Sequence, residues 1–142
     1  KGVRTAIATA GGVERSSSLL KRVGLYDYLD HIVSARQVAH GKPAPDVYLY
    51  ACSQLHVQPQ ECYAVEDSPN GIHSAYSAGC KVFMVPDLTQ PDAELEKFIY
   101  KKCGIACSTK GVFLNFFLQS LELCDKTDYK RNVHQGCTTE NA

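Results

Sequence analysis

Charged and hydroxyl side chains stand at three points where apolar or turn segments meet. Glu66 and Asp67 follow the apolar run 62–65, Lys42 is the second residue of the segment "GKPAPDVYL", and Thr9 lies near the end of the run "TAIATA". Two adjacent carboxylates in a partly dry site repel each other unless a cation compensates both, and Mg²⁺ is a hard cation that prefers oxygen ligands. A lysine can neutralise the charge of a transferring phosphoryl group. These residue types predict a site for a phosphate group and a divalent metal ion.

The turn after Thr9 is a second candidate contact for a phosphate. The hydroxyl of Thr9 and the N–H groups of Ala10 and Gly11 can bind phosphate oxygens, as glycine turns at strand ends permit. Each residue also has a simpler interpretation: Thr9 as a buried strand residue, Lys42 as a solvated loop lysine, and the two carboxylates as favourable charge at a helix N-terminus. No Gly-x-Gly-x-x-Gly follows, so "TAGG" is not a dinucleotide-binding fingerprint.

Four short runs of small and β-branched residues are typical of buried strands. Segments with a helical spacing of apolar residues separate them, and prolines stand near the first turn of the second and third helices, where a missing N–H costs nothing. Ser68 is expected to be the N-cap of the third helix, with Pro69 at its first position and Gly79 at its end. The predicted strands are residues 5–10, 31–35, 62–66 and 81–85.

Strands that alternate with helices form right-handed βαβ units on a parallel sheet that helices cover on both faces. We therefore predict a Rossmann-like α/β domain with three layers, α/β/α. Ligands of such sheets bind beyond the carboxyl ends of the strands, where helix N-termini also point. Thr9, Lys42 and the Glu66–Asp67 pair all fall at that edge, so the fold is expected to bring them together.

Composition narrows the class of protein. The chain has 142 residues, and its 15 Lys and Arg balance 15 Asp and Glu, so no net charge draws it to nucleic acid or to an anionic membrane. Its most apolar segment, 111–123, is too short to span a bilayer, which needs about 20 apolar residues. Seven scattered cysteines without a Cys-x-x-Cys pair favour reduced thiols, and no leader is expected, so a cytoplasmic location is predicted.

The order and spacing of the motifs resemble the haloacid dehalogenase superfamily, in the subgroup of β-phosphoglucomutase and phosphoglycolate-phosphatase-like enzymes. "AIATA" is similar to the family's second motif, an apolar strand ending in Thr or Ser; "GKPAPDVYL" is similar to the third, with its lysine; "AVEDSPNGIHSAYSAG" is similar to the fourth, the acidic metal motif. The resemblance covers residues 1–96. It implies that the domain is the core of such an enzyme.

The resemblance also implies a mechanism. In such enzymes an aspartate attacks the substrate phosphate to form an aspartyl-phosphate, and Mg²⁺ is shared by that aspartate and the fourth motif. By resemblance, Thr9 and Lys42 are catalytic residues that hold the phosphate, Glu66 and Asp67 bind the metal, and Ser68 supports them from behind.

The family's first motif, an Asp-x-Asp at the end of the central strand, is absent from this sequence, as is the helical cap domain. The missing strand belongs between the strands that end at Thr9 and Glu66, so the sheet is expected to have a gap in its middle. Three explanations stay open: the chain is the C-terminal part of a longer enzyme, it pairs with a partner chain that supplies the strand, or it is a degenerate protein that binds without catalysing.

The resulting expectation is a Mg²⁺-dependent phosphatase or phosphomutase-type hydrolase that acts on a small phosphorylated metabolite and lacks its nucleophile. Gly12 and Val13 stand where sugar-phosphate mutases carry polar residues, which favours a phosphatase. The alternative is a non-catalytic domain of the same fold that binds phosphate, metal or another protein.

The chain is expected to divide at two points. Residues 1–100 form the partial core, 101–124 a divergent tail, and 125–142 a polar, disordered C-terminus. Within the tail, residues 111–123 have the pattern of a helix that must bury most of its surface, either against the domain or in a homodimer or another partner chain.

Overall fold

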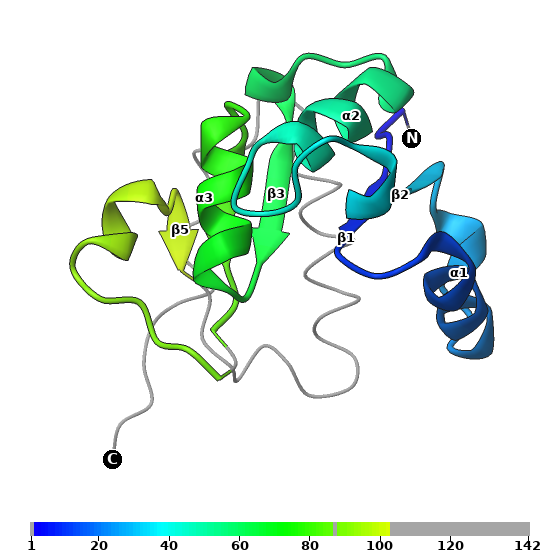
Figure 1. Ribbon diagram of the computed structural model, residues 1–142, viewed down its shortest axis with the longest axis horizontal. Coiled ribbons are helices and arrows are strands. Elements are labelled where there is room, and N and C mark those ends of the chain that lie inside the picture. The colour runs from blue at the N-terminus through cyan, green and yellow to red at the C-terminus, as the bar shows by residue number, and fades with distance from the viewer. Residues whose placement is uncertain (1, 87, 103–142) are drawn as a thin grey trace. The chain divides into compact units, whose positions relative to one another are not determined.

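The computed structural model describes residues 2–86 and 88–102, and those from Arg4 onward belong to one compact unit. Strands and helices alternate along it, as the sequence predicts (Figure 1). The strands are β1 (Ala6–Thr9), β2 (His31–Ser34), β3 (Tyr63–Glu66), β4 (Lys81–Met84) and β5 (Lys101–Lys102). The α-helices are α1 (Val13–Arg22), α2 (Asp46–Leu55) and α3 (Pro69–Ser77), and 3-10 turns cover Tyr26–Tyr28, Ala35–Gln37, Pro59–Glu61 and Leu95–Phe98.

The strands form two parallel sheets rather than one. β1 pairs with β2, with Thr9 opposite Ser34, and a second sheet has the order β3-β4-β5, with Glu66 opposite Met84. β1 and β3 run in the same direction in Figure 1, so Thr9 and Glu66 end their strands at the same edge. The all-parallel pairing confirms the predicted Rossmann-like α/β class.

The predicted gap in the middle of the sheet is confirmed, because β1 and β3 do not pair with each other among the described residues. Among the described residues, β1 pairs only with β2, and β3 pairs only with β4. All four residues of β1 are half-buried, and α1 has no fully buried residue. A strand inside a parallel sheet is normally buried on both faces, so the half-burial of β1 agrees with an edge that no described strand covers.

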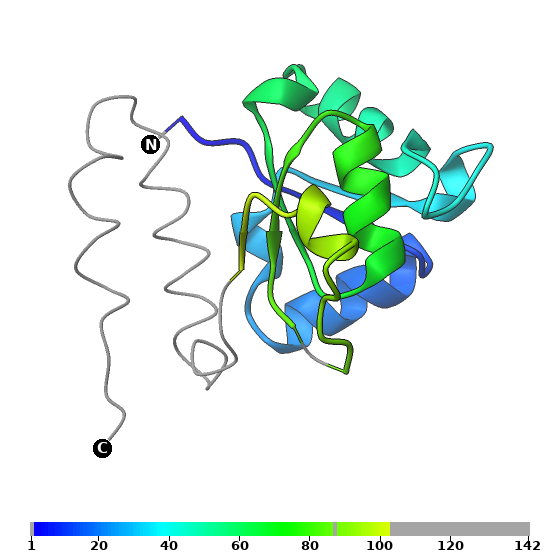
Figure 2. The same cartoon turned by 90° about the vertical axis from the view of Figure 1, so that its left-hand side faces the viewer.

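Helix α2 joins the two halves of the core. Its residues Val47 and Ala51 pack with Val33 of β2, whereas its Cys52 packs with the larger cluster around β3, β4 and α3. Figure 2 shows α2 and α3 together on the same side of the strands. The larger cluster contains Cys52, Ala64, Ile72, Ala75, Ala78, Cys80, Val82, Met84 and Leu95.

The ends of α3 follow the capping signals in the sequence. The Ser68 side chain accepts a hydrogen bond from the Gly71 N–H at 3.2 Å, and Pro69 is the first helical residue. Gly79 follows the helix with φ of +94°, a left-handed conformation that glycine adopts without strain. These local predictions are confirmed.

The predictions for residues 103–142, including the apolar segment 111–123, lie outside the described residues. Within the part that the structure describes, no helix combines the length and the apolar character that crossing a membrane requires.

Candidate functional site

Glu66 lies at the centre of the candidate site. It is the last residue of β3 and is 8% exposed. Its carboxylate accepts hydrogen bonds from the Lys42 ammonium and from the Tyr48 hydroxyl, so a loop, a helix and a strand meet at one group. A buried carboxylate requires such partners, because an uncompensated buried charge is strongly unfavourable.

Tyr48 is a neutral donor to this carboxylate. Burial, followed by the charge of Glu66, raises the pKa of the Tyr48 phenol, so the phenol stays protonated and donates a hydrogen bond to Glu66. The Lys42 nitrogen also lies 5.2 Å from the centre of the Tyr48 ring. Lys42 is 15% exposed at its side chain, so the cation is largely shielded while it stays at the edge of the protein.

Gly71 gives the Glu66 carboxylate its space. It lies in the first turn of α3, and a Cβ added at this position would overlap the Glu66 carboxylate. Position 71 therefore has to be glycine for this arrangement to exist. The reason is the close packing of the Glu66 carboxylate, and not the backbone conformation of Gly71.

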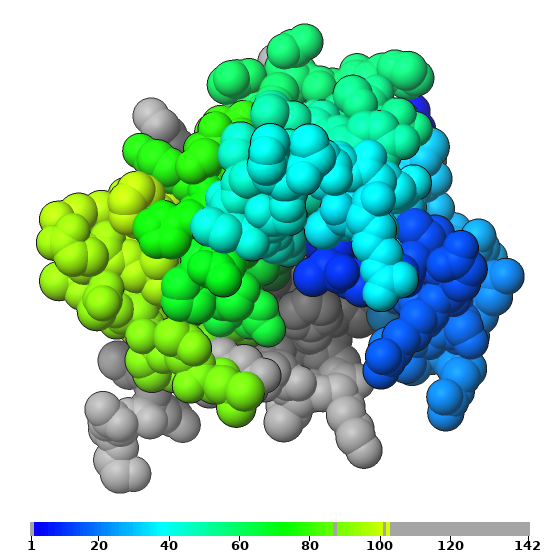
Figure 3. All heavy atoms as spheres, viewed as in Figure 1, coloured from blue at the N-terminus to red at the C-terminus, as the bar shows by residue number. Residues whose placement is uncertain are grey.

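The loop that carries Lys42 is fixed at both ends. The buried Ser74 of α3 donates a hydrogen bond to the Ala44 carbonyl at 2.6 Å, and the His40 N–H donates one to Asp46 at 3.1 Å. In the space-filling view the loop, coloured cyan, lies directly against α3, coloured green (Figure 3). Lys42 is thus a positioned lysine and not a freely solvated one.

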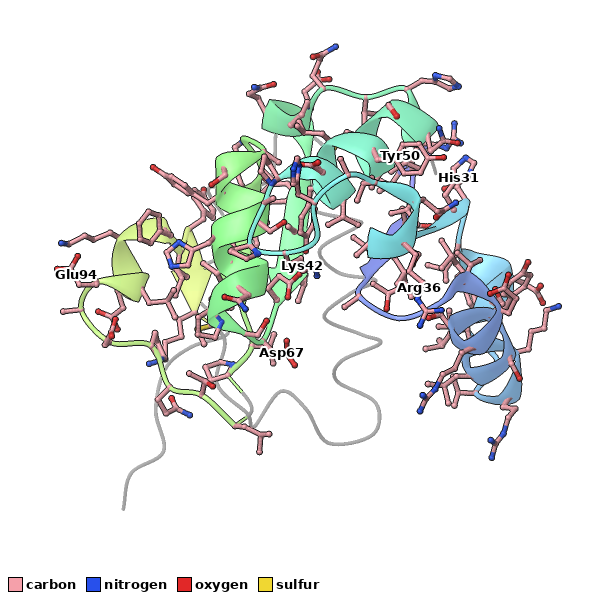
Figure 4. All side chains as sticks on the ribbon, viewed as in Figure 1. His31, Arg36, Lys42, Tyr50, Asp67 and Glu94 are labelled. Carbon is pink, nitrogen blue, oxygen red and sulfur yellow. The ribbon has the colours of Figure 1, made fainter. Side chains whose placement is uncertain are left out.

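Asp67 differs from its neighbour in exposure. Its side chain is exposed, and it lies near Lys42 beside the first turns of α3 (Figure 4). Among the described residues no three His, Cys, Asp or Glu side chains are close enough to hold a metal ion by themselves. Two carboxylates nevertheless fit Mg²⁺, which commonly takes one or two protein carboxylates and completes its shell with phosphate oxygens and water.

The turn after β1 is closed by its own hydrogen bonds. The Thr9 hydroxyl accepts a hydrogen bond from the Gly11 N–H at 3.0 Å. Ser34, 1% exposed at the end of β2, donates to the Gly11 carbonyl at 2.5 Å and accepts from the Arg36 N–H at 3.1 Å. The N–H of Gly11 is therefore directed towards Thr9 in this structure.

The structure brings together Lys42 and Glu66, and Asp67 and Ser68 directly follow Glu66 in the chain. Thr9, Ala10 and Gly11 lie at the carboxyl end of β1. Sequence reasoning missed Tyr48, Gly71 and Ser34. A signal existed for each: Tyr48 belongs to the lysine segment, Gly71 follows the cap at the spacing of one helical turn, and Ser34 ends a strand as Thr9 does.

Comparison with known proteins identifies the family. A family model described as haloacid dehalogenase-like hydrolase matches residues 1–85. The chain belongs to this family. It is 40% identical over 86 residues to the putative phosphatase YhcW of Bacillus subtilis, an overlap that covers 61% of this chain and 39% of the relative.

Solved structures of the same subgroup share the fold. A putative β-phosphoglucomutase from Thermotoga maritima has a TM-score of 0.68 at 29% identity, over 82% of this chain and 53% of that one. CbbY from Rhodobacter sphaeroides, solved in complex with phosphate, has a TM-score of 0.64 at 28% identity, over 74% of this chain and 51% of that one. This haloacid dehalogenase-like chain belongs to the phosphoglucomutase- and phosphatase-like subgroup. It spans 51–53% of these two solved structures and 39% of the curated relative.

Proposed function

We propose that this chain is the phosphate- and metal-binding part of a Mg²⁺-dependent phosphatase that acts on a small phosphorylated metabolite. The observation that carries the proposal is the Lys42–Glu66 pair beside the exposed Asp67, at the carboxyl end of β3. Glu66 is buried and holds Lys42 at the edge of the sheet, where the lysine cation can bind phosphate. The neighbouring Asp67 is exposed, so its oxygens can bind a metal ion.

The two carboxylates have different roles in this proposal. Lys42 already compensates Glu66, whose main task is to hold the lysine where phosphate oxygens would lie. Asp67 is the exposed oxygen donor and the principal ligand for Mg²⁺ within the described residues, with Glu66 as the second. Bound Mg²⁺ would neutralise charge on the phosphoryl group. Thr9, Ala10 and Gly11 would contact the phosphate from β1, and Ser68 would keep Asp67 in place by capping α3.

The nucleophile lies outside the residues that build this site. The sequence contains no Asp-x-Asp, and in this family an aspartate on the strand between β1 and β3 attacks the phosphate. The edges of β1 and β3 that face this gap carry no strand among the described residues. We propose that a further parallel strand fills the gap and supplies the aspartate, and that the chain alone does not turn over phosphate esters.

The substrate class is proposed on two grounds. The curated relative is named a putative phosphatase, and the CbbY structure was solved in complex with phosphate. Gly12 and Val13 follow the turn at Thr9, so this part of the chain offers no polar side chain for a second phosphate. A phosphatase is therefore favoured over a mutase.

The deciding experiment compares two proteins in p-nitrophenyl phosphate hydrolysis, with and without Mg²⁺. One is this chain. The other, the strand fusion, carries in addition an N-terminal strand of β-branched residues that ends in Asp-x-Asp, joined by a flexible linker. We expect Mg²⁺-dependent hydrolysis only by the strand fusion, and its loss in Asp67→Asn, whose side chain is exposed, and in Lys42→Met. Because Lys42→Met leaves the Glu66 carboxylate without its cation, circular dichroism has to show that this variant is folded.

Other outcomes would overturn parts of the proposal. Activity of the chain alone that disappears in Asp67→Asn would mean that a different nucleophile exists. A folded strand fusion that binds Mg²⁺ by calorimetry but never hydrolyses the ester would favour the non-catalytic binding domain. Equal Mg²⁺ affinity of the unmodified chain and Asp67→Asn would remove Asp67 from the metal site.

A further inference from the structure

Three cysteine thiols meet at the end of β3 opposite to Glu66. Cys62 directly precedes β3, Cys80 directly precedes β4, and Cys52 comes from α2. The Sγ atoms of Cys52 and Cys62 are 3.7 Å apart. A four-residue strand is about 13 Å long, so this cluster is separate from the phosphate and metal site.

The cluster is ordered by hydrogen bonds. The Cys52 thiol donates to the Cys62 sulfur, and the Cys62 thiol donates to the Gln58 carbonyl at 3.3 Å. Cys52 and Cys80 are 5% and 7% exposed, whereas Cys62 is half-buried and so open to a small reagent. Cys80 belongs to the same buried core cluster as Cys52, and a hydrogen bond with Cys52 lowers the pKa of Cys80.

We propose that Cys52 and Cys62 are a peroxide-sensitive pair that forms a reversible disulfide in the folded protein. The two sulfurs are 3.7 Å apart and have to approach to the S–S bond length of about 2.05 Å. The pair joins two elements that are already in contact, and neither cysteine belongs to the phosphate and metal site.

The reaction takes place in two balanced steps. The Cys62 sulfur attacks hydrogen peroxide, whose O–O bond breaks, to give a sulfenic acid and one water molecule. The Cys52 sulfur then attacks the sulfenic sulfur, loses its proton and displaces hydroxide, which leaves as a second water molecule. Together the thiols lose two electrons and two protons, and a thiol reductant reverses the change.

Cys62 is the first sulfur to react because it is half-buried, whereas Cys80, whose pKa is lowered, is only 7% exposed and is shielded from the reagent. Its hydrogen bond with Cys52, followed by burial, raises its pKa, so little of it is thiolate near neutral pH. The thiolate is the reactive form, and the oxidation should therefore become faster as the pH is raised.

The disulfide would connect α2 and β3, the helix and the strand that carry Tyr48 and Glu66. These two residues and Lys42 form the Glu66 cluster. Cys52 lies one helical turn beyond Tyr48 on α2, and Cys62 stands at the start of the strand that Glu66 ends. Oxidation would therefore fix α2 against β3 and make the unfolding of this half of the core less favourable, because a closed loop restricts the unfolded chain.

The pair can be identified directly by peptide mapping. The reduced chain is treated with hydrogen peroxide, remaining thiols are alkylated, and the protein is cleaved after glutamate. The three cysteines then fall on different fragments, 15–61, 62–66 and 67–94. We expect the fragment 62–66 to be linked to 15–61 with the loss of two hydrogen atoms, faster at higher pH, and to be released by dithiothreitol.

Two variants sharpen the test. Cys80→Ser should keep the link between fragments 15–61 and 62–66. Cys62→Ser should lose both the link and the rise in melting temperature that peroxide produces in the unmodified chain. The proposal is overturned if fragment 15–61 is linked to 67–94 instead. It is also overturned if Cys62 stays reduced, and is therefore recovered in alkylated form, while the protein's other thiols are oxidised.

Discussion

At the scale of single residues, the Glu66 carboxylate determines which neighbours it can have. One oxygen accepts hydrogen bonds from Lys42 and Tyr48, and the other lies against the backbone of Gly71. Each neighbour has its own role in keeping the carboxylate buried. Lys42 supplies a cation, Tyr48 a neutral hydrogen-bond donor, and Gly71 a position without a side chain.

Tyr48→Phe tests the neutral donor. The variant keeps the ring and removes the hydroxyl, so Glu66 retains only Lys42 as a partner. We expect the free energy of unfolding to fall by about 1–3 kcal/mol, as for other buried groups that lose a partner. Urea denaturation followed by circular dichroism measures it. Tyr50→Phe on the same helix is the matched control, because Tyr50 is not part of the Glu66 cluster; an equal loss in both variants would contradict the assignment.

Gly71→Ala tests the empty position. Replacing glycine by alanine inside a helix ordinarily stabilises a protein by about 1 kcal/mol. Here the added methyl group would overlap the Glu66 carboxylate, so we expect a net loss of about 1–3 kcal/mol in unfolding free energy. Asn70→Ala, at the exposed neighbouring position, should change stability little. A stabilised Gly71→Ala protein would show that Glu66 does not lie over α3.

At the scale of elements, the start of β1 is held to the start of β2 by Asp30. Its carboxylate accepts hydrogen bonds from the Thr5 N–H at 2.7 Å and from the Arg4 guanidinium at 3.0 Å. Thr5 is buried, and its hydroxyl donates to the Tyr28 carbonyl at 2.6 Å. These contacts hold the starts of β1 and β2 together.

Asp30→Asn tests that connection through its pH dependence. The hydrogen bond from the Thr5 N–H is the largest cause that lowers the pKa of Asp30 below its ordinary 3.8. A lowered pKa in the folded state contributes stability above pH 3.8, which is lost as the pH falls through the folded-state value. Because the side chain is partly exposed, we expect a difference of only about 0.5–1 kcal/mol at neutral pH.

The measurement is a series of urea titrations from neutral pH to about pH 2, in which the unmodified chain and the variant should converge below the ordinary pKa range of aspartate. Asp27→Asn, an exposed residue in the preceding turn, is the control. A difference between Asp30→Asn and the unmodified chain that stays constant over this range would exclude the carboxylate charge as its cause.

The elements were predictable from sequence because their signals are local. The four strands from residue 6 to residue 84, the Ser68 cap and the Gly79 end follow from runs of β-branched residues, a hydroxyl before proline and a glycine after a helix. The sequence placed Lys42 at the same edge of the sheet as Glu66, and in the structure the two side chains are hydrogen-bonded. Tyr48 and Ser34 have local signals too, but their roles depend on contacts with Glu66 and Gly11, 18 and 23 residues away in sequence, which the local pattern does not reveal.

At the scale of the whole molecule, the two parallel sheets share their core mainly through α2. Val47 and Ala51 of this helix contact one cluster and Cys52 contacts the other, while β1 and β3 do not pair among the described residues. Strand edges with free backbone groups are sites where a further strand can add. The two halves of the site, Thr9 on β1 and Glu66 on β3, therefore depend on whatever fills the space between these edges.

The strand fusion tests this dependence separately from catalysis. If the added strand inserts between β1 and β3, it buries new surface, so both the urea midpoint and the slope of unfolding free energy against urea should increase relative to this chain. A proline in the middle of the added strand should abolish the increase, because it removes a ladder hydrogen bond.

Replacing both aspartates of the added strand by asparagine separates structure from chemistry. This variant should keep the increased stability and lose Mg²⁺-dependent hydrolysis, because insertion depends on backbone pairing and catalysis on the carboxylates. Hydrolysis without any gain in stability would mean that the nucleophile reaches the Lys42 and Asp67 side chains without completing the sheet. In that case the open edges of β1 and β3 would have no part in assembling the site.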